Sequence, residues 1–158
     1  NSFGFAPIIS TLAPEKRASA AERFLQLCYP EGDAAAITRE VMQVLEHPEF
    51  AAVFGEGSLA EVPITGNAVD AQGNLRTISG QVDRLVVTAA EVLVVDYKTG
   101  RQVPQTEADI PTQYIRQMEQ YRVLLEKCYP AKTVRCALLW TVEPLFIPLR
   151  FNALRAAS

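Results

Sequence analysis

Three charged residues stand inside two strongly apolar runs of this sequence. Asp83 lies in "GQVDRLVV", and Asp96 and Lys98 end the run "VLVVDYK". Charged side chains are rarely fully buried unless they are paired or bind an ion. These positions are therefore the first candidates for chemistry.

The spacing of the two runs predicts that the three charges share one face of a sheet. If the loop between the runs is centred on residues 88–91, the hairpin pairs Leu85 with Val94 and Asp83 with Asp96. Directly opposed residues lie on the same face with Cβ atoms ~4.5–5.5 Å apart. Lys98 is two residues further on and joins that face. A slip of one residue would separate the two carboxylates.

Two adjacent carboxylates between apolar strands repel each other, so either one keeps its proton or a cation lies between them. Mg²⁺ takes one or two carboxylates together with waters and phosphate oxygens, and it can activate a bound water. An ammonium group nearby can offset charge that develops on a phosphate. This reading predicts a metal-dependent hydrolytic centre. In the structural alternative, Asp96 pairs with Lys98, and Asp83 pairs with Arg84 at a strand end. Spacing alone leaves both open.

The surrounding pattern predicts helices first and a sheet afterwards. Pro14 suits the first turn of one helix, and Asp33 can cap a second. Alternation then predicts strands over residues 60–66, 75–87 and 92–98, with a possible bulge at Gly80. A helix should follow from Pro111 to about Cys128, with Tyr114, Met118, Tyr121 and Leu125 along one stripe. Residues 133–141 and 145–151 read as further strands. This order predicts one mixed α/β domain around a central sheet.

Composition sets broad limits. The 158 residues suffice for one domain with its own core. A net charge of −3 argues against a free-standing nucleic-acid binder. Cys28, Cys128 and Cys136 form no metal-binding spacing, and we expect buried reduced thiols in a cytoplasmic protein.

The motifs resemble those of a known family. "GQVDRL" followed by "VVDYKTG" resembles the G-x-x-D and D-Y-K core of RecB-type nucleases, a branch of the PD-(D/E)XK superfamily. "YIRQMEQYRVLL" is similar to that branch's Q-x-x-x-Y motif, and "AEVPI" to its strand with an acidic residue, here Glu61. The resemblance implies a restriction-endonuclease-like core, a central mixed sheet flanked by helices. It also implies one nuclease domain over 1–158, with a helical lead-in (1–58) and a catalytic core (59–150), as a fragment of a larger helicase–nuclease.

Within that branch the closest likeness is to the C-terminal nuclease domains of AddA-type helicase–nuclease subunits. The likeness implies a bacterial, cytoplasmic DNA exonuclease that acts in double-strand break repair and recombination. Its partners would be single-stranded DNA from unwinding, the rest of the helicase chain and an AddB-like subunit. No G-x-x-x-x-G-K-[ST] motif occurs, so ATP chemistry is not assigned to these residues.

The resemblance also implies roles for individual residues. Asp83 and Asp96 would bind Mg²⁺ (or Mn²⁺), with the main-chain carbonyl of Tyr97 as a third oxygen, and Lys98 would assist the attacking water. Six further residues have implied roles at the site or on the DNA: Gln117 and Tyr121 would reach the metal site or the DNA backbone, Glu61 is a further acidic candidate, and Arg84, Arg101 and Arg116 would contact DNA. A wider basic surface would comprise Lys98, Arg101, Arg116, Arg122, Lys127, Lys132 and Arg135.

One feature departs from the family pattern. RecB-type nucleases usually carry a further His ligand upstream, and alignment by eye puts Ala6 at that position. The single histidine, His47, precedes Pro48 at a helix end, where a helix-terminal or surface role is the commoner one. The missing ligand motivates an alternative function, a catalytically weakened nuclease fold that channels DNA and docks the partner subunit.

Overall fold

The computed structural model describes residues 12–28, 33–55, 57–69, 73–142 and 145–151. Its centre is one five-stranded sheet in the order β1-β2-β3-β4-β5. The β3 and β4 strands pair in parallel, and the other neighbours pair antiparallel. A parallel pair needs a crossover, which the helix between these two strands provides. The strands are β1 (Ser58–Val69), β2 (Leu75–Val87), β3 (Glu91–Lys98), β4 (Thr133–Trp140) and β5 (Leu145–Pro148).

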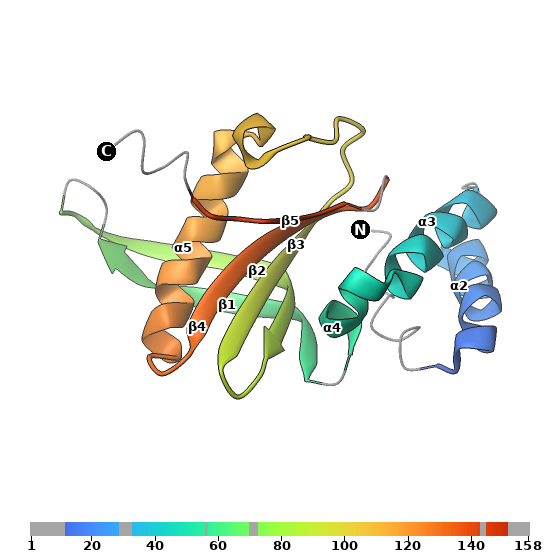
Figure 1. Ribbon diagram of the computed structural model, residues 1–158, viewed down its shortest axis with the longest axis horizontal. Coiled ribbons are helices and arrows are strands. Elements are labelled where there is room, and N and C mark those ends of the chain that lie inside the picture. The colour runs from blue at the N-terminus through green and yellow to red at the C-terminus, as the bar shows by residue number, and fades with distance from the viewer. Residues whose placement is uncertain (1–11, 29–32, 56, 70–72, 143–144, 152–158) are drawn as a thin grey trace.

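Helices cover both faces of the sheet, as Figure 1 shows. One apolar cluster joins α5 to residues such as Val92 and Val94, and a second joins the N-terminal helices to Val95 and Leu139. Successive strand residues point to opposite faces, so the two clusters lie on opposite sides. The predicted mixed sheet flanked by helices is confirmed. The helices are α2 (Pro14–Cys28), α3 (Ala34–Glu46), α4 (Ala51–Phe54) and α5 (Thr112–Cys128), with 3₁₀ turns η1 (Pro48–Phe50) and η2 (Glu107–Asp109).

Local signals in the sequence account for most element boundaries. The Asp33 carboxylate accepts a hydrogen bond from the Ala36 N–H at 2.9 Å and caps α3 as predicted. Helix α5 begins directly after Pro111. The β2–β3 hairpin has the predicted register, with Leu85 opposite Val94 and Val87 opposite Val92.

Two further observations concern the surface and the cysteines. None of the helices in the described part of the chain is long and apolar enough to cross a membrane. Cys136 is buried, and burial raises the pKa of its thiol to about 12. Cys128 is exposed, which corrects the expectation of buried thiols, and the side chain of Cys28 lies outside the described residues.

Candidate active site

Strand β2 loses its regular alternation at Asp83. Val82 and Leu85 both pack in the α5 cluster, although they are three residues apart, whereas Arg84 contacts α4 on the other face. In a regular strand, residues three apart point to opposite faces of the sheet. The alternation of side chains between the two faces is therefore interrupted at Asp83. On β1 the opposite residue is Glu61, at a φ of 52°, between the pairs Ala60–Arg84 and Val62–Val82.

The bulge predicted at Gly80 is therefore wrong in position. Gly80 pairs with Ile64 in regular register. The irregularity lies three residues later, where the first candidate carboxylate stands.

The Asp83 carboxylate lies in the gap that opens between β2 and β3. The β2–β3 ladder ends at the pair Arg84–Val95. Beyond it, the Tyr97 N–H donates to Asp83 Oδ2 at 2.6 Å. A side-chain oxygen thus accepts the hydrogen bond from β3 just past the end of the ladder, which draws the carboxylate toward Asp96.

The two carboxyl groups meet in this gap. Asp96 is buried, with 8% of its surface exposed, and its carboxyl group lies close enough to that of Asp83 to shift its pKa. The pKa of Asp83 rises from 3.8 to about 6, first because burial disfavours the charged form and then because Asp96 is negative. The Tyr97 N–H and the Lys98 charge oppose this rise.

Lys98 completes the group. Its ammonium forms an ion pair with Asp96 Oδ2, and Nζ lies 3.9 Å from the ring centroid of Tyr114, at the start of α5. The side chains of Lys98 and Asp96 are only 13% and 11% exposed, so the pair is shielded from solvent. The Asp96–Lys98 pair of the structural alternative is therefore present. Asp83, in contrast, accepts from the Tyr97 N–H rather than pairing with Arg84.

This donor set fits a hard divalent cation. Two carboxylates and one ammonium leave a half-buried group with surplus negative charge, and burial together with that charge raises the Asp83 pKa. Carboxylate oxygens are the donors that Mg²⁺ prefers. In the described part of the chain, no three His, Cys, Asp or Glu side chains come together. The remaining ligands would be water or main-chain oxygens, Tyr97 being the one predicted.

Two other acidic or basic candidates lie apart from this group. Glu61 is opposite Asp83 in register but exposed, and it joins no cluster of three possible ligands among the described residues. His47 stacks on Phe50 with ring centroids 4.3 Å apart, in the layer of N-terminal helices. Ala6, the position aligned with the missing family ligand, lies outside the described residues.

Gln117 and Tyr121 form a connected pair on α5. The Tyr121 hydroxyl accepts from Gln117 Nε2 at 3.3 Å and donates to the Gln81 carbonyl at 3.4 Å. Tyr121 is 3% exposed, and burial raises its pKa. The hydroxyl is thus engaged within the protein, two residues along β2 from Asp83, and not presented to DNA.

Arg84 is placed differently from its predicted role. It is 2% exposed, its Nε donates to the Val53 carbonyl at 3.1 Å, and its guanidinium carbon lies 5.0 Å from the Phe54 ring centroid. Burial lowers its pKa. The prediction that Arg84 contacts DNA is wrong, because its guanidinium group faces the helical layer. Arg101 and Arg116 are exposed.

Most of the wider basic surface is engaged within the chain. Arg122 pairs with Glu119 and Glu126 on α5, and Arg135 pairs with Glu91. Two lysines donate to main-chain carbonyls: Lys127 to Asn67, and Lys132 to Thr88 and Ala89. These charges are partly compensated and are weaker candidates for phosphate contacts than Arg101 and Arg116.

Sequence reasoning missed two residues of the site. Tyr114 was expected in the core stripe, yet its ring contacts the Lys98 ammonium. A Cβ on Gly80 would lie 2.2 Å from the Tyr121 hydroxyl, so this glycine makes room for the Tyr121 side chain. The Gly80 signal was present in the G-x-x-D spacing, whereas nothing in the spacing of Tyr114 distinguishes it from a core residue.

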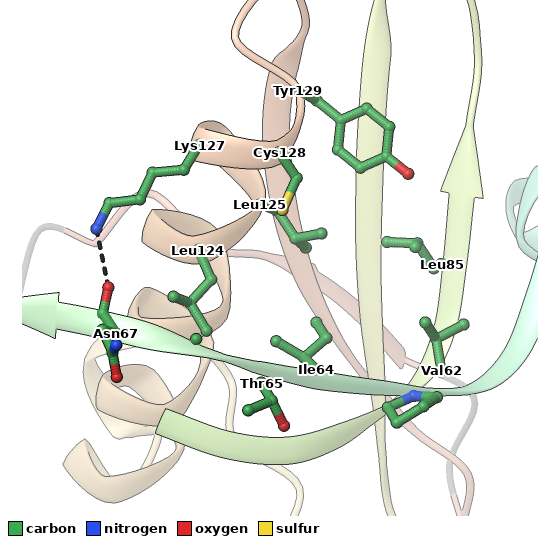
Figure 2. A pocket seen from close by; sticks show the side chains of 12 residues that line it. Val62, Ile64, Thr65, Asn67, Leu85, Leu124, Leu125, Lys127, Cys128 and Tyr129 are labelled. Carbon is green, nitrogen blue, oxygen red and sulfur yellow. Dashed lines mark hydrogen bonds between the residues drawn. The ribbon is translucent and has the colours of Figure 1, made fainter. Parts of the chain in front are cut away.

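A pocket of about 320 Å³ lies elsewhere, between β1 and the C-terminal half of α5 (Figure 2). Its walls are mainly apolar, from Val62, Ile64, Leu85, Leu124 and Leu125. None of the three charged residues of the candidate site lines it. The pocket and the carboxylate group are therefore separate features.

Comparison with known proteins identifies the family. No curated protein matches the chain. A solved structure titled "Crystal structure of SSO0001" is 15% identical, covers 86% of this chain and 67% of its own, and has a TM-score of 0.40. A family model described as the PD-(D/E)XK nuclease superfamily matches residues 9–146. The chain therefore belongs to the PD-(D/E)XK nuclease superfamily.

Proposed function

We propose that this chain is a Mg²⁺-dependent (or Mn²⁺-dependent) deoxyribonuclease module, the exonuclease domain of a bacterial helicase–nuclease. The observation that carries the proposal is the meeting of Asp83, Asp96 and Lys98 at the gap between β2 and β3. In a member of a nuclease superfamily, two carboxylates and an ammonium at one half-buried point support phosphodiester hydrolysis.

The residues of the chain have separable roles in this proposal. Asp83 and Asp96 hold the cation, and the Tyr97 N–H fixes one oxygen of Asp83 so that the other is free to bind it. A bound divalent cation supplies Lewis acidity and lowers the pKa of a coordinated water. Lys98, held between Asp96 and the Tyr114 ring, offsets the negative charge that develops on the phosphate.

Contact with DNA is proposed for two exposed arginines, Arg101 and Arg116. Arg116 lies in the first turns of α5, near Tyr114, and Arg101 follows β3 by three residues. Phosphate contacts by Lys and Arg give nucleic-acid binding most of its affinity. Two such side chains on a chain of net charge −3 would bind DNA weakly.

Weak intrinsic binding agrees with the proposed setting, in which a helicase delivers single-stranded DNA to the nuclease. A tethered substrate has a high effective concentration, so the domain need not grip DNA alone. The AddA-like context, the AddB-like partner and the role in double-strand break repair rest on sequence resemblance. Co-elution of the full natural polypeptide with an AddB-like subunit would support them, and separate elution at micromolar concentration would count against them.

The proposed activity is tested by cleavage of a labelled single-stranded oligonucleotide with and without Mg²⁺. We expect Asp96→Asn and Lys98→Met each to lower the rate by at least ~10²-fold, because a transition-state charge contact contributes about 3 kcal/mol. Glu91→Gln on the same strand and Lys127→Met on α5 are matched controls outside the site, and both should cleave as the unaltered chain does. Undiminished cleavage by both site variants would overturn the proposal.

One observation favours a second function. No three His, Cys, Asp or Glu side chains come together in the described residues, and alignment by eye puts Ala6 where the family pattern has a histidine. A docking and DNA-channelling module would then retain the fold without turnover. Calorimetry separates the two functions: absence of measurable heat on Mn²⁺ addition, with no cleavage in the full assembly, would favour docking.

A further inference from the structure

The irregular segment around Asp83 receives little support from its own sheet. Glu61 and Asp83 lie opposite each other, yet neither belongs to the β1–β2 pairing, and the β2–β3 ladder stops at Arg84. Glu61 also has a φ of 52°, a left-handed conformation that is unfavourable for a non-glycine residue. Other contacts must therefore hold the backbone of β2 at this point.

The first such contact comes from α5. The Tyr121 hydroxyl donates to the Gln81 carbonyl at 3.4 Å, two residues before Asp83. Pro63 lies opposite Gln81 on β1 and has no N–H to offer. The hydroxyl thus binds the backbone of β2 from the α5 side, and it can approach because residue 80 is glycine.

The second contact comes from the opposite layer. Arg84 directly follows Asp83, and its buried Nε donates to the Val53 carbonyl of α4 at 3.1 Å. Burying a guanidinium group against a neutral acceptor is costly, since the ion loses its hydration without gaining an opposite charge. Its stacking over Phe54, at 5.0 Å, recovers a part of that cost.

The two contacts act on either side of one residue and from opposite faces of the sheet. We propose that Tyr121 and Arg84 are positioning residues that clamp the backbone of β2 so that the Asp83 carboxylate points into the gap toward Tyr97 and Asp96. The effect of the clamp on catalysis rests on the proposed function. Its effect on the orientation of the Asp83 side chain does not require a bound metal.

The metal-free test is hydrogen exchange of the Tyr97 amide, which donates to Asp83 Oδ2. In Tyr121→Phe and in Arg84→Met we expect this amide to exchange at least ~10-fold faster, because freeing the clamp lowers the local opening free energy by about 1.4 kcal/mol or more. The amides of Val94 and Val95 serve as internal references on the same strand. Tyr129→Phe removes a hydroxyl from another tyrosine, at the far end of α5, and should leave the Tyr97 amide unchanged (Figure 2).

The functional test is Mn²⁺ affinity by calorimetry on the same variants. Loss of a group that orients a ligand typically weakens metal affinity ~10–100-fold. We expect that weakening in Tyr121→Phe and Arg84→Met, and unchanged Mn²⁺ affinity in Tyr129→Phe.

The outcomes are distinguishable. Tyr97 exchange unchanged in a folded Tyr121→Phe variant would overturn the clamp, and so would unchanged Mn²⁺ affinity in a chain that binds Mn²⁺. If the unaltered chain binds no Mn²⁺ but its Tyr97 amide responds to both substitutions, the clamp holds and the proposed metal chemistry fails. If Arg84→Met does not fold, Tyr121→Phe decides alone, since it removes a single oxygen atom.

Discussion

Lys98 owes its position to one carboxylate and one aromatic ring. Its ammonium is paired with Asp96 and lies 3.9 Å from the Tyr114 ring centroid, with 13% of the side chain exposed. A cation–π contact gains strength where water is excluded, and is worth about 1–2 kcal/mol there. Tyr114 should therefore matter to the reaction although it carries no group that reacts.

We predict that Tyr114→Leu lowers the turnover rate on single-stranded DNA about 5–30-fold, which corresponds to that energy. Tyr114→Phe keeps the ring and should remain within ~3-fold of the unaltered chain. The measurement is the single-turnover rate at saturating Mg²⁺. Equal rates for the leucine and phenylalanine variants would show that the ring does not orient Lys98.

The raised pKa of Asp83 predicts a pH-dependent stability in the absence of metal. The folded-state pKa of about 6 lies above the ordinary 3.8, so folding favours the protonated carboxyl. This contribution is fully present below pH 3.8 and is lost as the pH rises through about 6. The difference corresponds to at most about 3 kcal/mol, which partial exposure reduces to about 1–2 kcal/mol.

The measurement is urea unfolding of the metal-free chain and of Asp83→Asn at a series of pH values. The difference between the two should change by that amount across the window and be flat above it. Added Mg²⁺ should stabilise the unaltered chain above pH 6, as a ligand of the native state does, and the asparagine variant much less. A stability difference that does not vary with pH would mean that Asp83 titrates normally.

At the scale of elements, the contact of α5 with β2 depends on a missing side chain. A Cβ at Gly80 would lie 2.2 Å from the Tyr121 hydroxyl and 3.0 Å from two carbons of its ring. We predict that Gly80→Ala destabilises the chain by about 1–3 kcal/mol, the usual cost of overpacking. Adding Tyr121→Phe should recover part of this loss, because the shortest contact is to the oxygen atom.

Denaturant unfolding of the two single variants and the double variant measures the coupling. Gly100→Ala is the matched control, since a Cβ there meets nothing within 4 Å. If the losses in free energy of unfolding were strictly additive in the double variant, helix α5 would be shifting as a rigid body. The side chain at position 80 would then have no specific contact with the Tyr121 hydroxyl.

At the scale of the whole molecule, several of the cations around the sheet are already paired within the chain. The net charge is −3, and Arg122, Lys127, Lys132 and Arg135 all have partners within the chain. Arg101 and Arg116 are exposed, the first three residues after Lys98 and the second two residues after Tyr114. Binding of single-stranded DNA should therefore be weak and should depend on these two residues.

We predict that Arg101→Ala and Arg116→Ala each reduce the slope of log affinity against log salt by about 0.7, the value for one phosphate contact with a single strand. Fluorescence anisotropy with a labelled oligonucleotide in chelator measures the slope without cleavage. Lys132→Ala and Arg135→Ala are the controls and should leave the slope unchanged. Equal effects from all four substitutions would point to a diffuse field in place of a local contact surface.

The sequence by itself predicted the order of the main elements and the register of the paired part of the β2–β3 hairpin. The Val and Leu runs and the four-residue loop between them are local patterns, and they correctly predicted Leu85 opposite Val94. The Asp33 cap and the start of α5 after Pro111 are equally local. The motifs likewise indicated a superfamily that the family match confirms.

Only the tertiary structure decided how the charged residues lie. Three features depend on segments that are distant along the chain. They are the change of face of strand β2 at Asp83, the burial of Arg84 against α4, and the approach of Tyr121 to Gly80. Such contacts depend on how the helices pack on the sheet, and the periodicity of apolar residues in the sequence does not predict them. The same reason explains why the bulge was expected at Gly80 and why Arg84 was expected at the surface: each residue was judged by its neighbours in sequence, whereas its role is set by its neighbours in space.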